Sequence, residues 1–332
     1  MTRPASSDTA IELIDVAKTY GGRFGKATPA LRGVTMNVKR GEVFGLIGPN
    51  GAGKSTLVKI LMTVIRPSSC TGSLLGSPVG HKPALARIGY LPEHHAFPGY
   101  LTGAQVIDFF GAMAGLPRRE RKMRAGALLD LVGMTAWSRR KLRSYSKGMR
   151  QRIGIAQALI NDPELVLLDE PTDGVDPVGR REIRQIVEQI RDEGRTVLIN
   201  SHILSELEQL CDRFGLLVKG VMANAGTMDE LTEGQRRYHI AVRPESAEGI
   251  ELVEGSVHVD TEDPDELQPH IDRLRARGVV ITGIRSFRPT LEDIFMQTVT
   301  NPATGKAYNP GAVSPGEAGS HAGGQTGDEA NQ

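Results

Sequence analysis

The chain has 332 residues, of which 39% are hydrophobic and 24% charged, and its formal net charge is +1. These values are ordinary for globular domains, and the near-neutral charge gives no large basic field for nucleic acid. Its only cysteines are Cys70 and Cys211, which favours a reducing compartment. Residues 1–10 lack the apolar core of a signal peptide, and no apolar run reaches about 18 residues, so we expect any membrane role to come through a partner.

The first two thirds of the chain alternate predicted strands with predicted helices. Strands are expected over residues 11–20, 31–38, 43–47, 165–169 and 196–199. Helices are expected over 57–64, within 101–160 and over 180–191, with Val106, Phe109, Phe110 and Met113 forming one apolar stripe. This alternation favours a parallel sheet that is covered on both faces.

Composition changes after about residue 236. Strands are expected over 238–242, 256–259 and 279–284, and helices over 265–277 and 291–295, which makes residues 236–300 a small α+β appendage. Residues 301–332 are rich in glycine, proline, serine and alanine. Because such a segment has few large apolar side chains to bury, we expect it to be a disordered tail.

One stretch matches the phosphate-binding pattern GxxxxGK[ST]. Its candidate ligand residues are Gly48, Asn50, Gly51, Ala52, Gly53, Lys54, Ser55 and Thr56. A strand before it and a helix after it are the context that this motif requires, and they disfavour a glycine-rich turn that binds nothing. Backbone N–H groups and the helix N-terminus would hold phosphate, Lys54 would reach the outer phosphates, and Ser55 would sit on Mg²⁺.

Two further places carry candidate chemistry. Asp169 and Glu170 end a buried strand, where Asp169 is suited to hold Mg²⁺ and Glu170 to activate water; a solvated acidic pair is the alternative. Ser146 and Gly148 open a helix and offer a second anion site, although an N-cap serine is the plainer interpretation.

Together these motifs resemble the nucleotide-binding subunits of ATP-binding cassette (ABC) transporters over residues 11–235. Gly48–Thr56 matches the Walker A loop and residues 165–169 the Walker B strand. By the same resemblance, Tyr20 stacks on adenine, Ser146 and Gly148 form the signature, Glu170 is the catalytic glutamate, Asp176 belongs to the D-loop 171–176, and His202 is the switch histidine. Lys54, Glu170 and His202 are thus the implied catalytic residues, and Ser55, Glu93 and Asp169 the implied metal ligands.

The resemblance also implies a fold and partners. The fold is an α/β P-loop NTPase cassette, with a mixed sheet core and a helical subdomain at about 97–160. The cofactors are ATP and Mg²⁺. Two cassettes bind head to tail around two ATP molecules, as a homodimer or with a second cassette, and drive a separate integral membrane permease from the cytoplasmic face of the membrane. No nucleic acid is expected.

Three positions depart from the family pattern. Glu93 stands where Gln is usual; its carboxylate can ligate Mg²⁺ but cannot donate a hydrogen bond when ionised. Lys147 replaces the first of two usual signature glycines, and Met149 replaces a glutamine. Lys147 either adds charge near the γ-phosphate or points to solvent, and the sequence leaves both open.

Residues 288–295 resemble the C-terminal regions of single-cassette exporters of the drug, antibiotic and polysaccharide types, so we expect an ATP-hydrolysing exporter subunit. One alternative is a soluble ABC-type ATPase that acts on ribosomes or DNA; the single Walker A loop, the lack of a heptad run and the neutral charge disfavour it. A nucleotide switch without turnover is disfavoured by Glu170 and His202. The membrane chain selects the cargo in this architecture.

Overall fold

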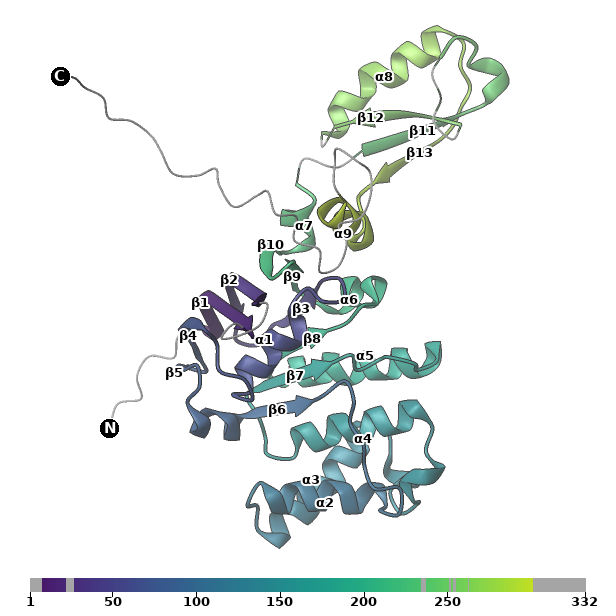
Figure 1. Ribbon diagram of the computed structural model, residues 1–332. Coiled ribbons are helices and arrows are strands. Elements are labelled where there is room, and N and C mark those ends of the chain that lie inside the picture. Colours follow the sequence, from purple (N-terminus) through teal and green to yellow (C-terminus); the bar gives the residue numbers. More distant parts are fainter. Residues whose placement is uncertain are drawn as a thin grey trace, which may run out of the picture.

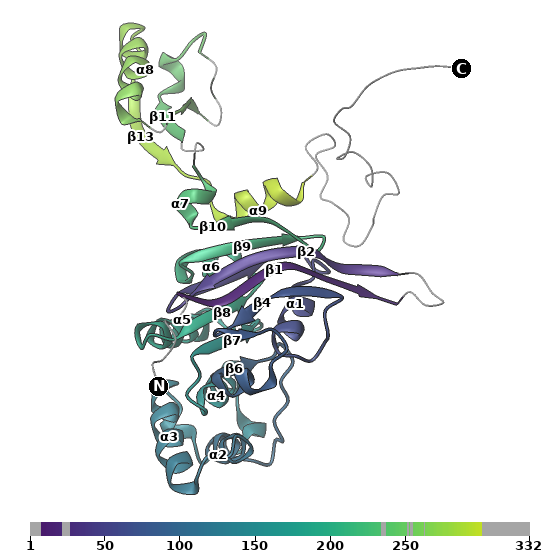
Figure 2. The same cartoon turned by 90° about the vertical axis from the view of Figure 1, so that its left-hand side faces the viewer.

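The structure is a computed structural model that shows a small unit standing on a larger body (Figures 1 and 2). It describes residues 8–21, 27–233, 237–250, 252, 255–261 and 263–300. The predicted tail, residues 301–332, and most of the N-terminal segment 1–10 lie outside this range. In the part that is described, no helix combines the length and the apolar character needed to cross a bilayer.

A six-stranded mixed sheet forms the centre of the larger body. Its strands are β3 (Val43–Ile47), β6 (Ile88–Leu91), β7 (Leu165–Asp169), β8 (Thr196–Asn200), β9 (Arg213–Val218) and β10 (Val221–Gly226). The order is β10-β9-β3-β8-β7-β6, and only the edge strand β10 runs antiparallel to its neighbour. Every residue of β3, β7 and β8 is buried, which is why these strands are nearly continuous apolar runs. The predicted α/β cassette with a mixed sheet is confirmed.

A second, antiparallel sheet covers one side of this core. It has the order β2-β1-β4-β5 and consists of β1 (Thr9–Tyr20), β2 (Thr28–Lys39), β4 (Ser69–Leu74) and β5 (Ser77–Pro78). Helix α1 (Lys54–Leu61) shares a hydrophobic cluster with it, in which Leu13, Val34, Phe44 and Leu57 are fully buried. This packing fixes the phosphate loop, because that loop connects β3 to α1.

Five further helices complete the larger body. They are α2 (Gly103–Met113), α3 (Arg118–Leu131), α4 (Lys147–Leu159), α5 (Pro177–Asp192) and α6 (Leu204–Leu210). Helices α4, α5 and α6 pack against the central sheet, and α2 and α3 pack on α4. Short 3₁₀ turns occur at Lys82–Arg87, Thr135–Trp137 and Leu142–Ser144. Helices α2 to α4 lie together at one end, as expected for a helical subdomain (Figure 1).

The predicted apolar stripe on α2 was wrong in part. Val106 is buried and Phe110 partly buried, but Phe109 is 53% exposed and Met113 70% exposed. The reason is geometric: the buried arc of α2 is centred near Ile107, and a turn of 100° per residue carries Phe109 to the far side of the helix.

The appendage has its own core. Strands β11 (Arg237–Val242), β12 (Ser256–Asp260) and β13 (Ile281–Phe287) form an antiparallel sheet in the order β12-β11-β13, with a short 3₁₀ turn at Pro244–Ser246. Helix α8 (Pro264–Ala276) covers one face, and Ile240, Val259, Leu267 and Ile271 are buried between them.

Two short helices connect the appendage to the cassette. Helix α7 (Met228–Leu231) precedes the appendage and α9 (Leu291–Val299) follows it. Leu291 and Ile294 of α9 belong to the cassette's hydrophobic cluster, not to the appendage's. The structure therefore differs from the predicted 236–300 unit at its last helix, which returns to pack beside α6 and β9.

Candidate functional site

The phosphate loop has a geometry that only glycine permits at two positions. A Cβ on Gly48 would stand 2.2 Å from the carbonyl oxygen of Leu217, and one on Gly53 would stand 2.7 Å from that of Ala30. Gly53 also has a left-handed φ of 111° and caps the N-terminus of α1. The loop is thus held close to neighbouring backbone while the first N–H groups of α1 face its hollow, which is the arrangement that binds phosphate oxygens.

Lys54 places its ammonium group inside this loop. The side chain is buried, and its Nζ donates to the carbonyl oxygens of Gly48 and Pro49. Burial lowers the pKa of Lys54, and the negative charges of Glu170, Asp169 and Glu93 oppose that shift. The fold therefore gathers these three predicted carboxylates around the predicted lysine.

Asp169 ends β7 next to the end of β8. Its carboxylate accepts a hydrogen bond of 2.5 Å from the amide nitrogen of Asn200, which is its register partner. Burial raises the pKa of Asp169, and the Asn200 hydrogen bond works against this rise. Among the described residues the Asn200 amide oxygen has no hydrogen-bond partner although it is buried, so the site contains an oxygen acceptor that the protein itself leaves unsatisfied.

Glu170 and His202 form a second close pair. His202 Nδ1 lies 2.7 Å from Glu170 Oε2, and the His202 backbone N–H donates to the same oxygen at 3.3 Å. Burial raises the pKa of Glu170, and the charge and hydrogen bonds of His202 oppose the rise. Two hydrogen bonds on Oε2 fix the rotation of the carboxylate.

The Glu170 backbone is held in a strained conformation. Its φ is 52°, in the left-handed region that bulky residues rarely adopt. Its N–H donates to the carbonyl of Asn200 at 2.8 Å, and its carbonyl accepts from the side chain of Gln151 at 3.4 Å. Such strain persists where surrounding contacts over-determine it, and it turns the chain sharply after β7.

Sequence reasoning missed Asn200 and Gln151. Asn200 could have been found, because it is a polar residue directly after the apolar run 197–199, in a strand parallel to the one ending in Asp169. Gln151 gives no such signal: it sits in a helix with apolar neighbours, and only the packing of α4 brings its amide to the Glu170 carbonyl.

Tyr20 and Glu93 lie at the edges of the site. The ring of Tyr20 is 40% exposed, and its hydroxyl is 3.4 Å from Thr56 Oγ1 in the first turn of α1. Glu93 follows β6, and its side chain is about half exposed. Its Oε1 lies 3.7 Å from Nδ1 of His94. Tyr20 thus offers a partly exposed ring beside the phosphate loop, with the Lys18 Nζ 5.2 Å from the ring centroid. Glu93 offers a solvent-accessible carboxylate close enough to influence the pKa of Asp169.

The signature residues lie on a different surface. Ser146 caps α4 by accepting from the Met149 N–H at 3.2 Å, and Asp176 caps α5 by accepting from Gly179 at 2.7 Å. These caps and Gly148 border one hollow, and none of its lining residues belongs to the phosphate loop. The fold thus separates the two predicted anion sites of one chain.

Lys147 is held by its own D-loop. Its Nζ lies 2.6 Å from Asp173 Oδ2, and this hydrogen bond lowers the pKa of the Asp173 carboxyl. The lysine is therefore tied to Asp173 while half of its side chain stays exposed to solvent.

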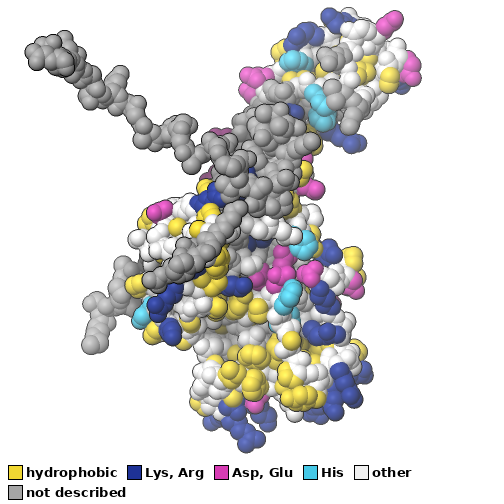
Figure 3. Space-filling view, in the orientation of Figure 1, with side chains coloured by type: hydrophobic (Ala, Val, Ile, Leu, Met, Phe, Trp, Pro, Cys, Tyr) yellow, Lys and Arg dark blue, Asp and Glu magenta, His cyan; other side chains and the backbone are white. Residues whose placement is uncertain are grey.

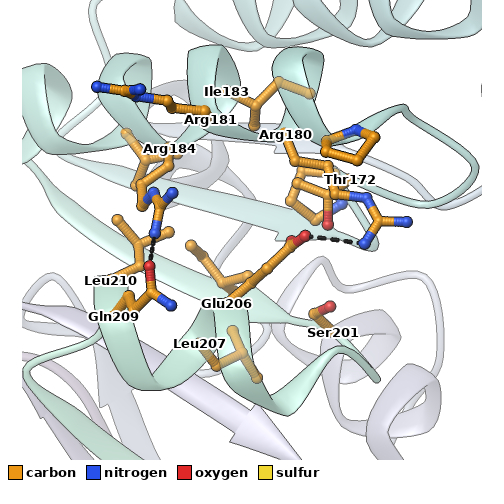
Figure 4. A pocket seen from close by; sticks show the side chains of 14 residues that line it. Thr172, Arg180, Arg181, Ile183, Arg184, Ser201, Glu206, Leu207, Gln209 and Leu210 are labelled. Atoms are coloured by element: carbon orange, nitrogen blue, oxygen red, sulfur yellow. Dashed lines mark hydrogen bonds and ion pairs between the residues drawn. The ribbon is translucent and has the colours of Figure 1, made fainter.

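A separate apolar pocket lies between α5 and α6 (Figure 4). Its volume is about 170 Å³, and Arg180 and Glu206 pair at its wall with 3.2 Å between Nη1 and Oε1. It contains no phosphate-loop residue. This pocket is therefore separate from the predicted phosphate site at Lys54.

The residues present fit a magnesium-bound triphosphate. Ser55 follows Lys54 at the start of α1, and Asp169 supplies a carboxylate with oxygen ligands of the kind that Mg²⁺ prefers. The unsatisfied Asn200 oxygen beside Asp169 is a hydrogen-bond acceptor that a water molecule on a bound metal ion would satisfy.

Comparisons with known proteins all point to one family. The model of the ABC transporter family matches residues 31–173. An uncharacterized ABC transporter ATP-binding protein of Synechocystis sp. is 38% identical over 304 residues, covering 89% of this chain and 86% of the relative. A daunorubicin resistance ATP-binding protein of Streptomyces coeruleorubidus is 35% identical and covers 87% of this chain and 96% of its own.

Solved structures agree with the fold. A subunit of the cbiONQ ABC transporter complex from Clostridium perfringens superposes with a TM-score of 0.61 at 29% identity, over 68% of this chain and 91% of that one. A structure described as the ATP binding subunit of an ABC transporter superposes with a TM-score of 0.59 at 29% identity. The match covers 67% of this chain and 92% of that chain. The chain belongs to the ABC transporter family, as one of its ATP-binding, ATP-hydrolysing proteins.

Proposed function

We propose that two copies of this chain bind head to tail around two ATP molecules and power a separate membrane exporter. The observation that carries the proposal is the separation of the two anion sites. Lys54, Asp169 and Glu170 surround the phosphate loop, whereas Ser146 and Gly148 border another hollow. A second cassette that is turned head to tail brings its Ser146 and Gly148 to the open side of the first phosphate loop.

Within each site the residues have distinct roles. Glu170 accepts a proton from the attacking water, and His202 holds its carboxylate in place through Oε2. Lys54 and the loop amides stabilise the charge on the outer phosphates, and Tyr20 stacks on the adenine. Mg²⁺, held by Ser55, Asp169 and Glu93, neutralises phosphate charge when it is bound.

Replacement of Glu170 tests both the base and the shared site. Glu170→Gln keeps the shape of the side chain but removes the base, so turnover should fall by about 10²- to 10⁴-fold while ATP binding through Lys54 persists. Because the γ-phosphate is then kept, dimers should accumulate with ATP and Mg²⁺ in size-exclusion chromatography with light scattering. Lys54→Ala, which weakens phosphate binding, is the control and should stay monomeric. Near-normal turnover in Glu170→Gln would overturn the role of the base.

The identity of the partner rests on the relatives. Several are named for resistance to or transport of antibiotics, among them the daunorubicin resistance protein and a bacitracin transport ATP-binding protein of Bacillus licheniformis that is 30% identical over 88% of this chain. We infer that this chain serves an exporter permease at the cytoplasmic face of the membrane. When co-expressed with that permease, it should remain in salt-washed membranes; co-purification with ribosomes instead would favour a translation role.

A further inference from the structure

The helical subdomain concentrates positive charge that the chain as a whole does not have. Its first part, residues 97–143 before α4, contains nine Lys or Arg and three Asp or Glu, a net charge of +6, whereas the whole chain has +1. Two of the nine are neutralised locally: Arg121 pairs with Asp108 at 2.8 Å and Arg124 with Glu120 at 2.7 Å. The excess is therefore carried by side chains that have no such partner.

We define the basic face as six exposed cations and four exposed apolar side chains. The cations are Arg118, Arg119, Lys122, Arg139, Lys141 and Arg143. Within the described residues their charged groups make no ion pair or hydrogen bond. The apolar members are Tyr100 at 71% exposure, Phe109 at 53%, and Met113 and Met123 at 70% each. Cations and large apolar groups share this surface, so it is neither an ordinary solvated surface nor an ordinary apolar patch.

The fold places cations at both ends of the exposed side of α2. At the N-terminal end of α2, the segment with Tyr100 runs beside the segment 139–143, which carries three of the six cations. The Arg143 N–H donates to the Gly99 carbonyl at 3.1 Å. At the C-terminal end of α2, α3 begins with Arg118 only a short turn after Met113. Figure 3 shows hydrophobic and basic side chains gathered at this end of the molecule, with few acidic ones.

We propose that the basic face contacts the anionic phospholipid surface of the membrane. A bilayer interface takes up both chemistries at once: phosphate headgroups attract Lys and Arg, and the acyl boundary accepts Met, Phe and Tyr side chains. Nucleic acid would satisfy the cations but would leave Met113 and Met123 in water. This inference adds a lipid contact to the proposed permease contact and does not depend on the permease or on ATP.

The test uses the purified full-length chain and vesicles without any partner. Co-sedimentation is measured with pure phosphatidylcholine and with a phosphatidylcholine–phosphatidylglycerol mixture, at low and high salt. Each cation near an anionic surface strengthens binding about fivefold, so the triple variant Arg118→Gln, Arg119→Gln, Lys122→Gln should bind the mixed vesicles about a hundredfold more weakly. Binding by the parent chain should also fall steeply with salt.

A matched control removes the same number of positive charges from another part of the protein. Arg273→Gln, Arg275→Gln, Arg277→Gln removes three exposed arginines from the appendage and should leave vesicle binding nearly unchanged. Met113→Gln, Met123→Gln keeps the charge and should weaken binding several-fold. ATPase activity, which none of these residues serves, reports that each variant is folded.

Three results would overturn the proposal. The first is equal binding to both vesicle types. The second is an equal loss in the two triple variants, which would mean that net charge and not the basic face determines binding. The third is tighter binding to a single-stranded oligonucleotide than to the mixed vesicles, lost in the Arg118, Arg119 and Lys122 variant, which would assign the face to nucleic acid.

Discussion

The cassette and the appendage differ in what their cores can bury. The cassette has two large hydrophobic clusters on its central sheet, and it also buries Lys54, Asp169 and Glu170. In the described part of the appendage, the buried core is a single layer of apolar side chains between one helix and three strands. Burying charge is costly unless partners and dipoles are fixed around it, and a larger core supplies them. Perturbed pKa values and nucleotide chemistry therefore lie in the cassette.

The face of the appendage sheet opposite α8 carries a different feature. His239 and His258 stack with ring centroids 3.9 Å apart, and Phe287 stacks on His239 at 5.2 Å. These rings come from three neighbouring strands and alternate with the residues that face α8. The ladder stabilises the small sheet across its strands, where little core is available.

The first prediction concerns α9 and the region whose free energy of unfolding it affects. Leu291 is fully buried in the cassette cluster and Leu267 is buried in the appendage cluster. Leu291→Ala should cost about 2–5 kcal/mol of cassette stability, because it removes a buried side chain and leaves a cavity. Leu267→Ala should cost a similar amount but act on the appendage. Urea unfolding followed by ATPase activity separates them: activity should be lost earlier only for Leu291→Ala. Equal loss in both would show that the two regions unfold as one.

The second prediction concerns the His202 contact with Glu170. His202→Ala removes the imidazole contact with Glu170 Oε2 but keeps the backbone N–H donor. Because the carboxylate then loses the shorter of its two orienting contacts, turnover should fall by about 10²-fold. Glu170 works as a base only when ionised, so activity is lost as the pH falls through its pKa. Because His202 opposes the burial-raised pKa, its removal should move the acid limb of the pH–rate profile to higher pH. An unchanged limb would show that another group controls it.

The third prediction tests Glu93 as a metal ligand. Glu93→Ala should raise the Mg²⁺ concentration required for half-maximal ATPase activity by about tenfold, since one oxygen ligand is lost. ATP binding, which depends on Lys54 and the loop amides, should largely survive. Glu93→Gln keeps an oxygen ligand and should be mild. If the glutamine variant is as inactive as the alanine variant, the carboxylate has a role other than metal binding.

The smallest expected effect is that of Glu164. Hydrogen bonds from Arg87, and to a lesser extent from Arg40, lower the pKa of the Glu164 carboxyl to about 2. The same ion pairs join three segments that are distant in sequence. Because the pKa of Glu164 is lower in the folded state, this carboxylate stabilises the fold at pH values above about 4.5, its pKa in the unfolded chain. The stabilisation is lost as the pH falls from about 4.5 toward 2. The side chain is 43% exposed, so Glu164→Gln should cost at most about 1 kcal/mol at neutral pH. Thermal unfolding at pH 7 and pH 3 checks this, with exposed Glu245→Gln in the appendage as the control.

Much of the cassette follows from local sequence. The buried strands contain the apolar runs 43–47, 165–168 and 197–199, and the phosphate loop contains Gly48 and Gly53, where a Cβ would clash with neighbouring backbone. Asp169 and Glu170 could be located because a buried parallel strand ends in two carboxylates. These features depend on residues close together in the chain, and local patterns carry that information.

The remaining features needed the tertiary structure. The exposure of Phe109, the return of α9 to the cassette and the pairing of Lys147 with Asp173 depend on which surface another element covers. Gln151 reaches Glu170 only because α4 packs beside β7. The left-handed φ of Glu170 is imposed by contacts from two other elements. Hydrophobic periodicity indicates which side chains could be buried, whereas contacts between elements distant in sequence determine which of them are buried.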